Sequence, residues 1–209
     1  MNHQLLVLAS GPFGKDVARR LEQGSRERGH RITLMEMDEG THPSLWPRAD
    51  VIVLATSHER PRIYEAADHA AFAWKVPWFG VHSTATDVVC GPVVVPGRTA
   101  CHHCYVRRRS QHARLERGAD TTGDRYPAGY PAHHVGIAAA FARQALDEAL
   151  QPVDSGGGIG GTVRKFDQIS GATNRASVVA VDRCGRCRTR HASDELWRRL
   201  ASIDEGLTA

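Results

Sequence analysis

Four of the five cysteines in the chain form two Cys-x-x-Cys pairs. One pair is Cys101 and Cys104, and the other is Cys184 and Cys187. Zinc prefers tetrahedral coordination by thiolates, and a Cys-x-x-Cys turn places two sulfur atoms on one side of the ion. The pairs are far apart in the sequence, so the fold must bring them together. The pattern predicts a closed, structural Zn²⁺ site that joins the middle of the chain to its C-terminal strands.

Two other interpretations of these cysteines stay open, namely two separate redox pairs or four free thiols. We favour zinc over redox pairs, because a thioredoxin-like redox pair would lie at the start of a helix that follows a strand. The first ten residues have no basic lead and no cleavage site of small residues, which disfavours a secreted disulfide protein. The fifth cysteine, Cys90, precedes Gly91-Pro92 in an apolar stretch, and we expect it to be a buried, unreactive thiol.

A second candidate site is the turn after the first predicted strand. Gly11 and Gly14 lie between an apolar run and a helical pattern, where backbone N–H groups and a helix N-terminus can hold a phosphate. Asp38 ends the second predicted strand, where an acid that binds a ribose is expected. Pro12 removes one N–H, and the three-glycine pattern is incomplete. The sequence leaves open a weak, vestigial nucleotide site or the same turn without nucleotide.

The histidines and arginines in the middle of the chain form less specific patterns. We expect His102 and His103, between the first two cysteines, to be exposed on the metal knuckle. His133 and His134 start a helical pattern and could cap it or pack against it. No catalytic residue is assigned, because a catalytic histidine needs a partner that the sequence does not show. The run 107–109 (Arg-Arg-Arg) is either a solvated face or a surface for an acidic peptide.

The elements that must position these residues alternate between strand and helix. Apolar runs predict strands at 4–9, 31–37, 50–55, 76–81 and 88–95, and amphipathic patterns predict helices at 15–28, 61–75 and 133–150. Paired strands are predicted at 162–169 and 176–181 around a Ser-Gly turn, and a short terminal helix at 194–203. The alternation predicts an α/β fold with a parallel sheet.

The composition fits a globular chain that buries a core. Hydrophobic residues make up 41% and charged residues 24% of 209 residues, which disfavours disorder or a fibrous repeat. No apolar run approaches the length of a membrane span, and no export signal is present, so we expect a cytoplasmic protein. The net charge of +4 comes with scattered arginines and predicts no nucleic-acid partner.

Several of these motifs together resemble the ThiF-like, ubiquitin-activating-type proteins, and more narrowly those of thiazole/oxazole-modified peptide biosynthesis. The similar block runs from Val76-Pro77-Trp78 through a Gly-Pro…Pro-Gly stretch at 91–97 to the first cysteine pair and its basic run. The second cysteine pair and the opening strand, glycine turn and helix are similar as well. The resemblance implies a homodimer with a truncated Rossmann-like α/β unit at 1–95 and a zinc-clipped C-terminal half of the same domain at 96–209.

The resemblance also implies a function. In azole-forming clusters, such proteins bind the leader of a ribosomal precursor peptide and present it to a YcaO-type cyclodehydratase, which uses ATP to activate the backbone amide. The implied role is an accessory partner without catalysis of its own. Interface anchors are expected among the arginines and tyrosines of the segment 105–130, because both residue types are favoured there. They are Tyr105, the run 107–109, Arg114, Arg117, Arg125, Tyr126 and Tyr130.

Two departures from the family pattern shape the alternatives. Such proteins often carry a winged-helix precursor-recognition domain, but here Met1 leads straight into the first strand, so another chain is expected to supply leader recognition if this one does not. Adenylating relatives have a long segment with an Arg and a Lys for ATP, whereas only 39–49 separates Asp38 from the next strand. ATP binding is therefore disfavoured. An ATP-dependent adenylating enzyme and a plain zinc-stabilised interaction module stay open.

Overall fold

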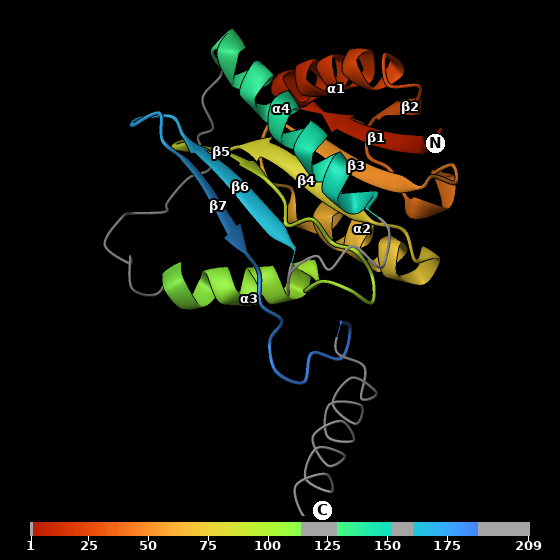
Figure 1. Cartoon of the computed structure of the whole chain (residues 1–209), viewed down its shortest axis with the longest axis vertical. Helices are drawn as coiled ribbons and strands as arrows, with labels where there is room; N and C mark the ends of the chain where they lie inside the picture. Colours follow the sequence, from red (N-terminus) through yellow and green to blue (C-terminus); the bar gives the residue numbers. More distant parts are fainter. Residues whose placement is uncertain (1, 114–128, 152–160, 188–209) are drawn as a thin grey trace, which may run out of the picture.

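The computed structural model describes residues 2–113, 129–151 and 161–187 of the chain. These residues form one seven-stranded sheet with the strand order β2-β1-β3-β4-β5-β6-β7 (Figure 1). The first four strands are mutually parallel, and β5, β6 and β7 each run antiparallel to the strand before them in this order. The strands are β1 (Gln4–Ser10), β2 (Arg31–Glu36), β3 (Val51–Thr56), β4 (Trp78–Ser83), β5 (Asp87–Cys90), β6 (Thr162–Asp167) and β7 (Thr173–Ser177). The predicted α/β fold with a parallel core is confirmed.

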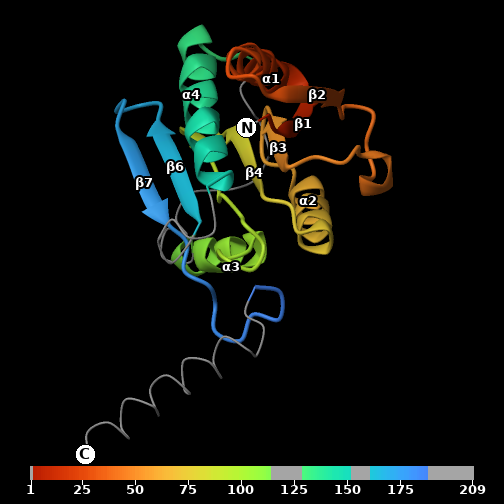
Figure 2. The same cartoon turned by 45° about the vertical axis from the view of Figure 1, so that its right-hand side comes forward.

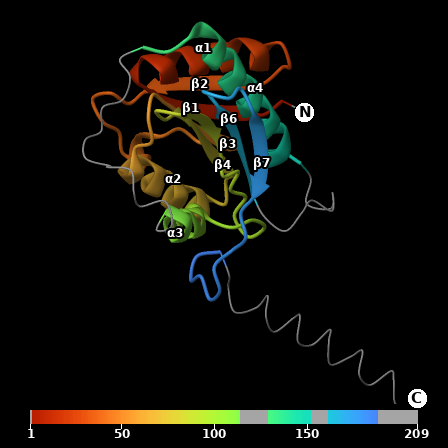
Figure 3. The same cartoon turned by 90° about the vertical axis from the view of Figure 1, so that its left-hand side faces the viewer.

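Helices cover both faces of the sheet. They are α1 (Gly11–Arg26), α2 (Pro61–Trp74), α3 (His102–Ala113) and α4 (Ala132–Ala149), with a short 3-10 helix η1 (Pro43–Leu45). Figures 2 and 3 show α1 and α4 together on one face, with α2 on the other face and α3 beside α2. The sheet is continuous from β5 into β6, so the two halves of the chain share one sheet.

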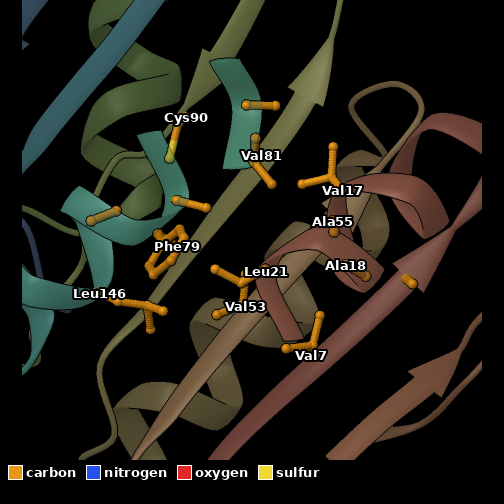
Figure 4. Packing of buried hydrophobic residues seen from close by; sticks show 14 of the residues in the cluster. Val7, Val17, Ala18, Leu21, Val53, Ala55, Phe79, Val81, Cys90 and Leu146 are labelled. Carbon is orange, nitrogen blue, oxygen red and sulfur yellow. The ribbon is translucent and has the colours of Figure 1, made fainter. Parts of the chain in front are cut away.

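Two apolar layers explain why β1 and β3 are uninterrupted hydrophobic runs. Alternate residues of a strand point to opposite faces of a sheet. Val7 and Val53 therefore pack against α1 and α4, together with Leu21 and Leu146 (Figure 4). Leu6, Leu8, Ile52 and Leu54 pack against α2 on the other face. Helices on both faces bury both sets of side chains, which is typical of parallel sheets.

The predicted boundary of the first helix is wrong. The helix begins at Gly11, so the residues predicted to form a turn are its first turn. Pro12 is compatible with this position, because the first N–H groups of a helix have no intrahelical partner.

The strand predicted at 88–95 is also too long. It ends at Cys90, since Gly91 has a φ of +114° and Pro92 has no N–H for the ladder. Beyond it, an isolated bridge between Val94 and Trp78 remains. Cys90 is fully buried, as predicted, and burial raises the pKa of its thiol to about 12.

The two antiparallel strands after α4 are shifted from their predicted ranges. The turn begins early because the Asp167 carboxylate accepts N–H groups from Ile169 and Ser170 at 2.8 Å. The predicted helix at 194–203 and the candidate anchors Arg114, Arg117, Arg125 and Tyr126 lie outside the described residues. Within the described ranges, every helix is too short or too polar to cross a lipid bilayer.

Candidate metal centre and nucleotide-binding turn

The fold brings the two cysteine pairs together. The four Sγ atoms lie within 4.8 Å of one another, and neighbouring atoms are 3.5 to 3.7 Å apart. A tetrahedron with Zn–S distances of about 2.3 Å has edges of about 3.8 Å, whereas a disulfide bond is about 2.05 Å long. The first pair lies at the start of α3, and the second follows β7. The predicted four-cysteine cluster is therefore confirmed.

The donor set suits a soft divalent metal. Cys101, Cys104 and Cys184 are buried, and Cys187 is half-buried. The backbone N–H of Val181 donates to the Cys104 sulfur at 3.3 Å. Burial and neighbouring thiols raise the pKa of Cys104 to about 11, while hydrogen bonds from the other thiols lower the pKa of Cys187 to about 5. A cation would stabilise all four thiolates, and four protein ligands would leave no open position for water.

An ion pair between a half-buried arginine and a buried carboxylate forms a second connection, from the cysteine knuckle to α2. Arg186, inside the second Cys-x-x-Cys, reaches the Asp68 carboxylate of α2 at 2.5 Å. The same carboxylate accepts the Trp78 indole N–H at 3.1 Å and the His102 backbone N–H at 3.3 Å. Asp68 is fully buried, so these donors replace its water. Sequence reasoning missed Asp68, because a single acid in an alanine-rich helix carries no signal of its own.

The prediction that His102 is exposed is wrong. Its ring lies between Tyr64, Trp78 and Tyr105, with centroid distances of 5.5 to 5.9 Å. It is the first residue of α3, and the approach of α3 to α2 turns this position inward. Burial lowers its pKa. His103, the next residue, is exposed as predicted.

The three arginines at 107–109 have different environments. Arg109 pairs with the Glu59 carboxylate at 2.7 Å and lies over the Tyr105 ring, 5.2 Å from its centroid. Arg108 donates to a backbone carbonyl after β7 at 3.4 Å. Arg107 is exposed, and its side chain makes no hydrogen bond or ion pair with the described residues. Of the three, only the Arg107 side chain has no partner in the part of the chain that the structure describes.

Both glycines of the candidate nucleotide turn have a packing reason. A Cβ atom on Gly14 would lie 2.3 Å from the Ala55 carbonyl oxygen, so Gly14 lets α1 approach β3 closely. Gly11 has a φ of +69°, and its Cβ would lie 2.3 Å from the Ser57 hydroxyl. Glycines at these positions are therefore explained by the fold, with or without a nucleotide.

Asp38 lies at the same turn, and its carboxylate is already paired. It accepts the Gly11 N–H at 2.8 Å and the Ser10 hydroxyl at 2.9 Å, and it pairs with Lys15 at 2.8 Å. The Lys15 hydrogen bond is the main reason why the pKa of Asp38 is lowered to about 2. Arg60 also donates to the Ser10 hydroxyl at 2.7 Å. Sequence reasoning missed Lys15 and Arg60, although Lys15 directly follows Gly14.

A crevice with a volume of about 560 Å³ opens beside this turn, at the carboxyl ends of the parallel strands. Ligands of open α/β sheets bind at this end. It is lined by the start of α1, the start of α4 and the β6–β7 turn. Three residues with hydroxyl groups, Ser57, Ser83 and Thr84, also line it. His134 also lines it, is 5% exposed, and its Nδ1 has no hydrogen-bond partner among the described residues.

No protein-family model matches the chain, and no curated protein matches it in sequence. Solved structures match it in fold. The heterocyclase TruD aligns with a TM-score of 0.61 and 18% identity over 88% of this chain and 27% of its own. E. coli MccB aligns with a TM-score of 0.57 and 14% identity over 90% of this chain and 66% of its own. A heterocyclase in complex with substrate and cofactor aligns with a TM-score of 0.56 and 16% identity.

These likenesses show the fold of the chain. The chain is similar in architecture to the heterocyclase and to MccB over about nine tenths of its length, which confirms at the level of the fold the resemblance stated from the sequence. The chain spans 27% of the length of TruD and 66% of the length of MccB. MccB has been solved with ATP and with N-formylated MccA.

Proposed function

We propose that the chain is an accessory protein of thiazole/oxazole-forming peptide biosynthesis, which binds a ribosomal precursor peptide, a YcaO-type cyclodehydratase or both. The observation that carries the proposal is the likeness in fold to the heterocyclase TruD over 88% of the chain. The cysteine motifs and the Gly-Pro…Pro-Gly block support the same assignment. By the same resemblance, we propose a homodimer.

The pairing of Asp38 supports an accessory role over an adenylating one. A ribose would have to compete with Lys15 and Ser10 for this carboxylate, and a phosphate would have to compete with Asp38 for the Gly11 N–H. The short segment between β2 and β3 supports the same interpretation. We therefore propose that the nucleotide site is vestigial in this chain.

The four-cysteine cluster is proposed to hold a structural Zn²⁺. Cys101, Cys104, Cys184 and Cys187 would be its ligands. The ion would neutralise part of the thiolate charge and fix the segment after β7 to the start of α3. With four protein ligands, its contribution is to stability.

An adenylating enzyme remains the second candidate, and the crevice beside Gly11 is the observation that favours it. The N-termini of α1 and α4 both contribute to its lining, and helix N-termini favour anions. A plain zinc-stabilised interaction module is the third, since the four-cysteine cluster suits any such scaffold.

Copurification and reconstitution test the proposed function. The full, zinc-loaded chain would be tagged and coexpressed with a YcaO-type cyclodehydratase and a precursor peptide encoded beside it. Both partners, or one of them, should copurify, and adding the chain should increase ATP-dependent loss of water from the precursor, measured by mass spectrometry. Absence of copurification together with unchanged dehydration would contradict the proposal.

The Arg107→Glu variant tests whether the basic surface of α3 contributes to partner binding. Arg107 is chosen because Arg109 is already paired with Glu59. If the surface contributes, this variant should copurify less of the partner than the wild type does.

A further inference from the structure

A groove at the amino ends of the parallel strands lies opposite the nucleotide-binding turn. It has a volume of about 700 Å³ and is lined by Gln4 at the start of β1, by residues of the segment 43–50, and by Trp74 and Val76 at the end of α2. We call these residues the tryptophan groove. The groove lies apart from the crevice beside Gly11, which opens at the carboxyl ends of the strands.

Two tryptophans form the apolar wall of this groove. The rings of Trp46 and Trp74 meet edge to face, with centroids 6.2 Å apart. Trp46 is buried and fixed by a hydrogen bond from its indole N–H to the Thr41 hydroxyl at 2.7 Å. Trp74 is 43% exposed and lines the groove. An exposed aromatic ring in a concave surface is typical of a binding site, because aromatic residues contribute strongly to interface energies.

The acidic side chain that lines the groove has a hydrogen-bond partner, whereas the basic side chain that lines it has none among the described residues. The Asp50 carboxylate accepts the Gln4 backbone N–H at 2.8 Å and lies 3.7 Å from the His3 ring. In contrast, the exposed Arg48 guanidinium lines the groove without a hydrogen bond or ion pair to any described residue. The Lys75 side chain, directly after Trp74, likewise has no partner within the described part of the chain. The groove therefore presents the unpaired Arg48 beside the Trp74 ring, with Lys75 nearby, whereas its one acidic side chain, Asp50, already accepts the Gln4 N–H.

We propose that the tryptophan groove binds an acidic peptide segment that carries a large apolar side chain. The apolar side chain packs on the exposed ring of Trp74, which Trp46 supports from behind, and a neighbouring carboxylate pairs with Arg48. Lys75 and the net charge of +4 favour the approach of the same acidic segment. The inference rests on the proposed function, since it names the kind of precursor segment that the chain recognises. It places that segment away from both the metal centre and the nucleotide-binding turn.

Fluorescence anisotropy with a labelled probe peptide tests this site. The probe is a short fluorescein-labelled peptide in which Leu and Phe alternate with Asp and Glu, titrated with the zinc-loaded full chain. Arg48→Glu and Trp74→Ala should each weaken binding by about tenfold or more. Arg62→Glu is the matched control, because Arg62 is exposed on α2 and does not line the groove. It should leave the affinity within about twofold. Unchanged melting temperatures would show that the variants fold.

Two further probes separate charge from apolar contact. A peptide with Ser in place of Leu and Phe, and one with Lys in place of Asp and Glu, should each bind at least about tenfold more weakly. Equal binding of the original probe to the wild type, Arg48→Glu and Trp74→Ala overturns the inference. A Trp74→Ala variant that turns a dimer into a monomer in light scattering, without any probe binding by the wild type, overturns it too, since the occupant is then a second copy. The proposed function fails separately, when neither cyclodehydratase nor precursor copurifies with the wild type and the chain leaves dehydration of the precursor unchanged.

Discussion

Asp68 shows how one residue couples the metal-binding segment to the sheet. Its side chain is 1% exposed and receives donors from the knuckle, from β4 and from the start of α3. Removing one partner of a buried ion pair leaves an uncompensated charge, which costs far more than a surface pair contributes. Arg186, which lies between Cys184 and Cys187, therefore stabilises the fold by satisfying the Asp68 carboxylate.

Arg186→Gln should lower the free energy of unfolding by about 3 kcal/mol, because the Asp68 carboxylate then stays buried with fewer donors. Urea unfolding with saturating zinc measures this change. Arg183→Gln is the matched control in the same loop, since the Arg183 side chain is 94% exposed, and it should stay within about 0.5 kcal/mol of the wild type. Equal stability of both variants would show that the Asp68 pair is unimportant.

At the scale of the secondary-structure elements, the close approach of α1 to β3 depends on the absence of a side chain at one position, Gly14. Gly14 lies in the first turn of α1, where the backbone of Ala55 leaves no room for a Cβ atom. The clash involves backbone, so it cannot be relieved by a rotamer change. Gly24 lies on the same helix. A Cβ atom added there would have the flexible Arg143 side chain as its nearest neighbour, at 3.5 Å.

Gly14→Ala should destabilise the protein by about 3 kcal/mol, because α1 must move away from β3. Gly24→Ala should be neutral or stabilise by up to about 1 kcal/mol, since alanine favours helix at an uncrowded position. Thermal unfolding of both variants gives the comparison. A Gly14→Ala protein as stable as Gly24→Ala would contradict the close packing of α1 on β3.

The sequence predicted most of the elements and the four-cysteine cluster because both depend on local or strongly typed patterns. β1 and β3 are continuous apolar runs, and Cys-x-x-Cys spacing has few structural meanings. The start of α1 was missed because Gly and Pro indicate a turn as readily as a helix N-terminus. The pairing of Asp68 with Arg186 joins residues 118 positions apart, and a long-range pair of this kind has no local pattern. The burial of His102 likewise depends on the packing of α3 against α2.

At the scale of the whole molecule, the cysteine cluster ties the segment after β7 to α3. β7 is an exposed edge strand, and the segment that follows it packs into a small apolar cluster around the cysteines. The parallel strands, in contrast, lie in two apolar cores. A metal ion held by the four cysteines would therefore stabilise the C-terminal part of the sheet more than its parallel core.

Removing zinc with a strong chelator should lower the melting temperature by about 10 °C or more, because binding free energy at such sites is folding free energy. Hydrogen exchange should accelerate in α3, β7 and the segment 178–187, while β1 and β3 stay protected. Cys104→Ser should reproduce the effect without a chelator and reduce the zinc content below one ion per chain. Uniform acceleration across the sheet, or none, would contradict a local role for the metal.

ATP–pyrophosphate exchange by the purified, zinc-loaded chain, with Mg²⁺ and the precursor peptide present, tests the accessory role most directly. Adenylation of a carboxylate is reversible and incorporates labelled pyrophosphate into ATP, whereas a binding partner without a nucleotide site does not. The pairing of Asp38 with Lys15 and Gly11 predicts no exchange above the level without protein. Exchange above that level, abolished by Asp38→Asn, would contradict the accessory role and assign the chain to the adenylating enzymes.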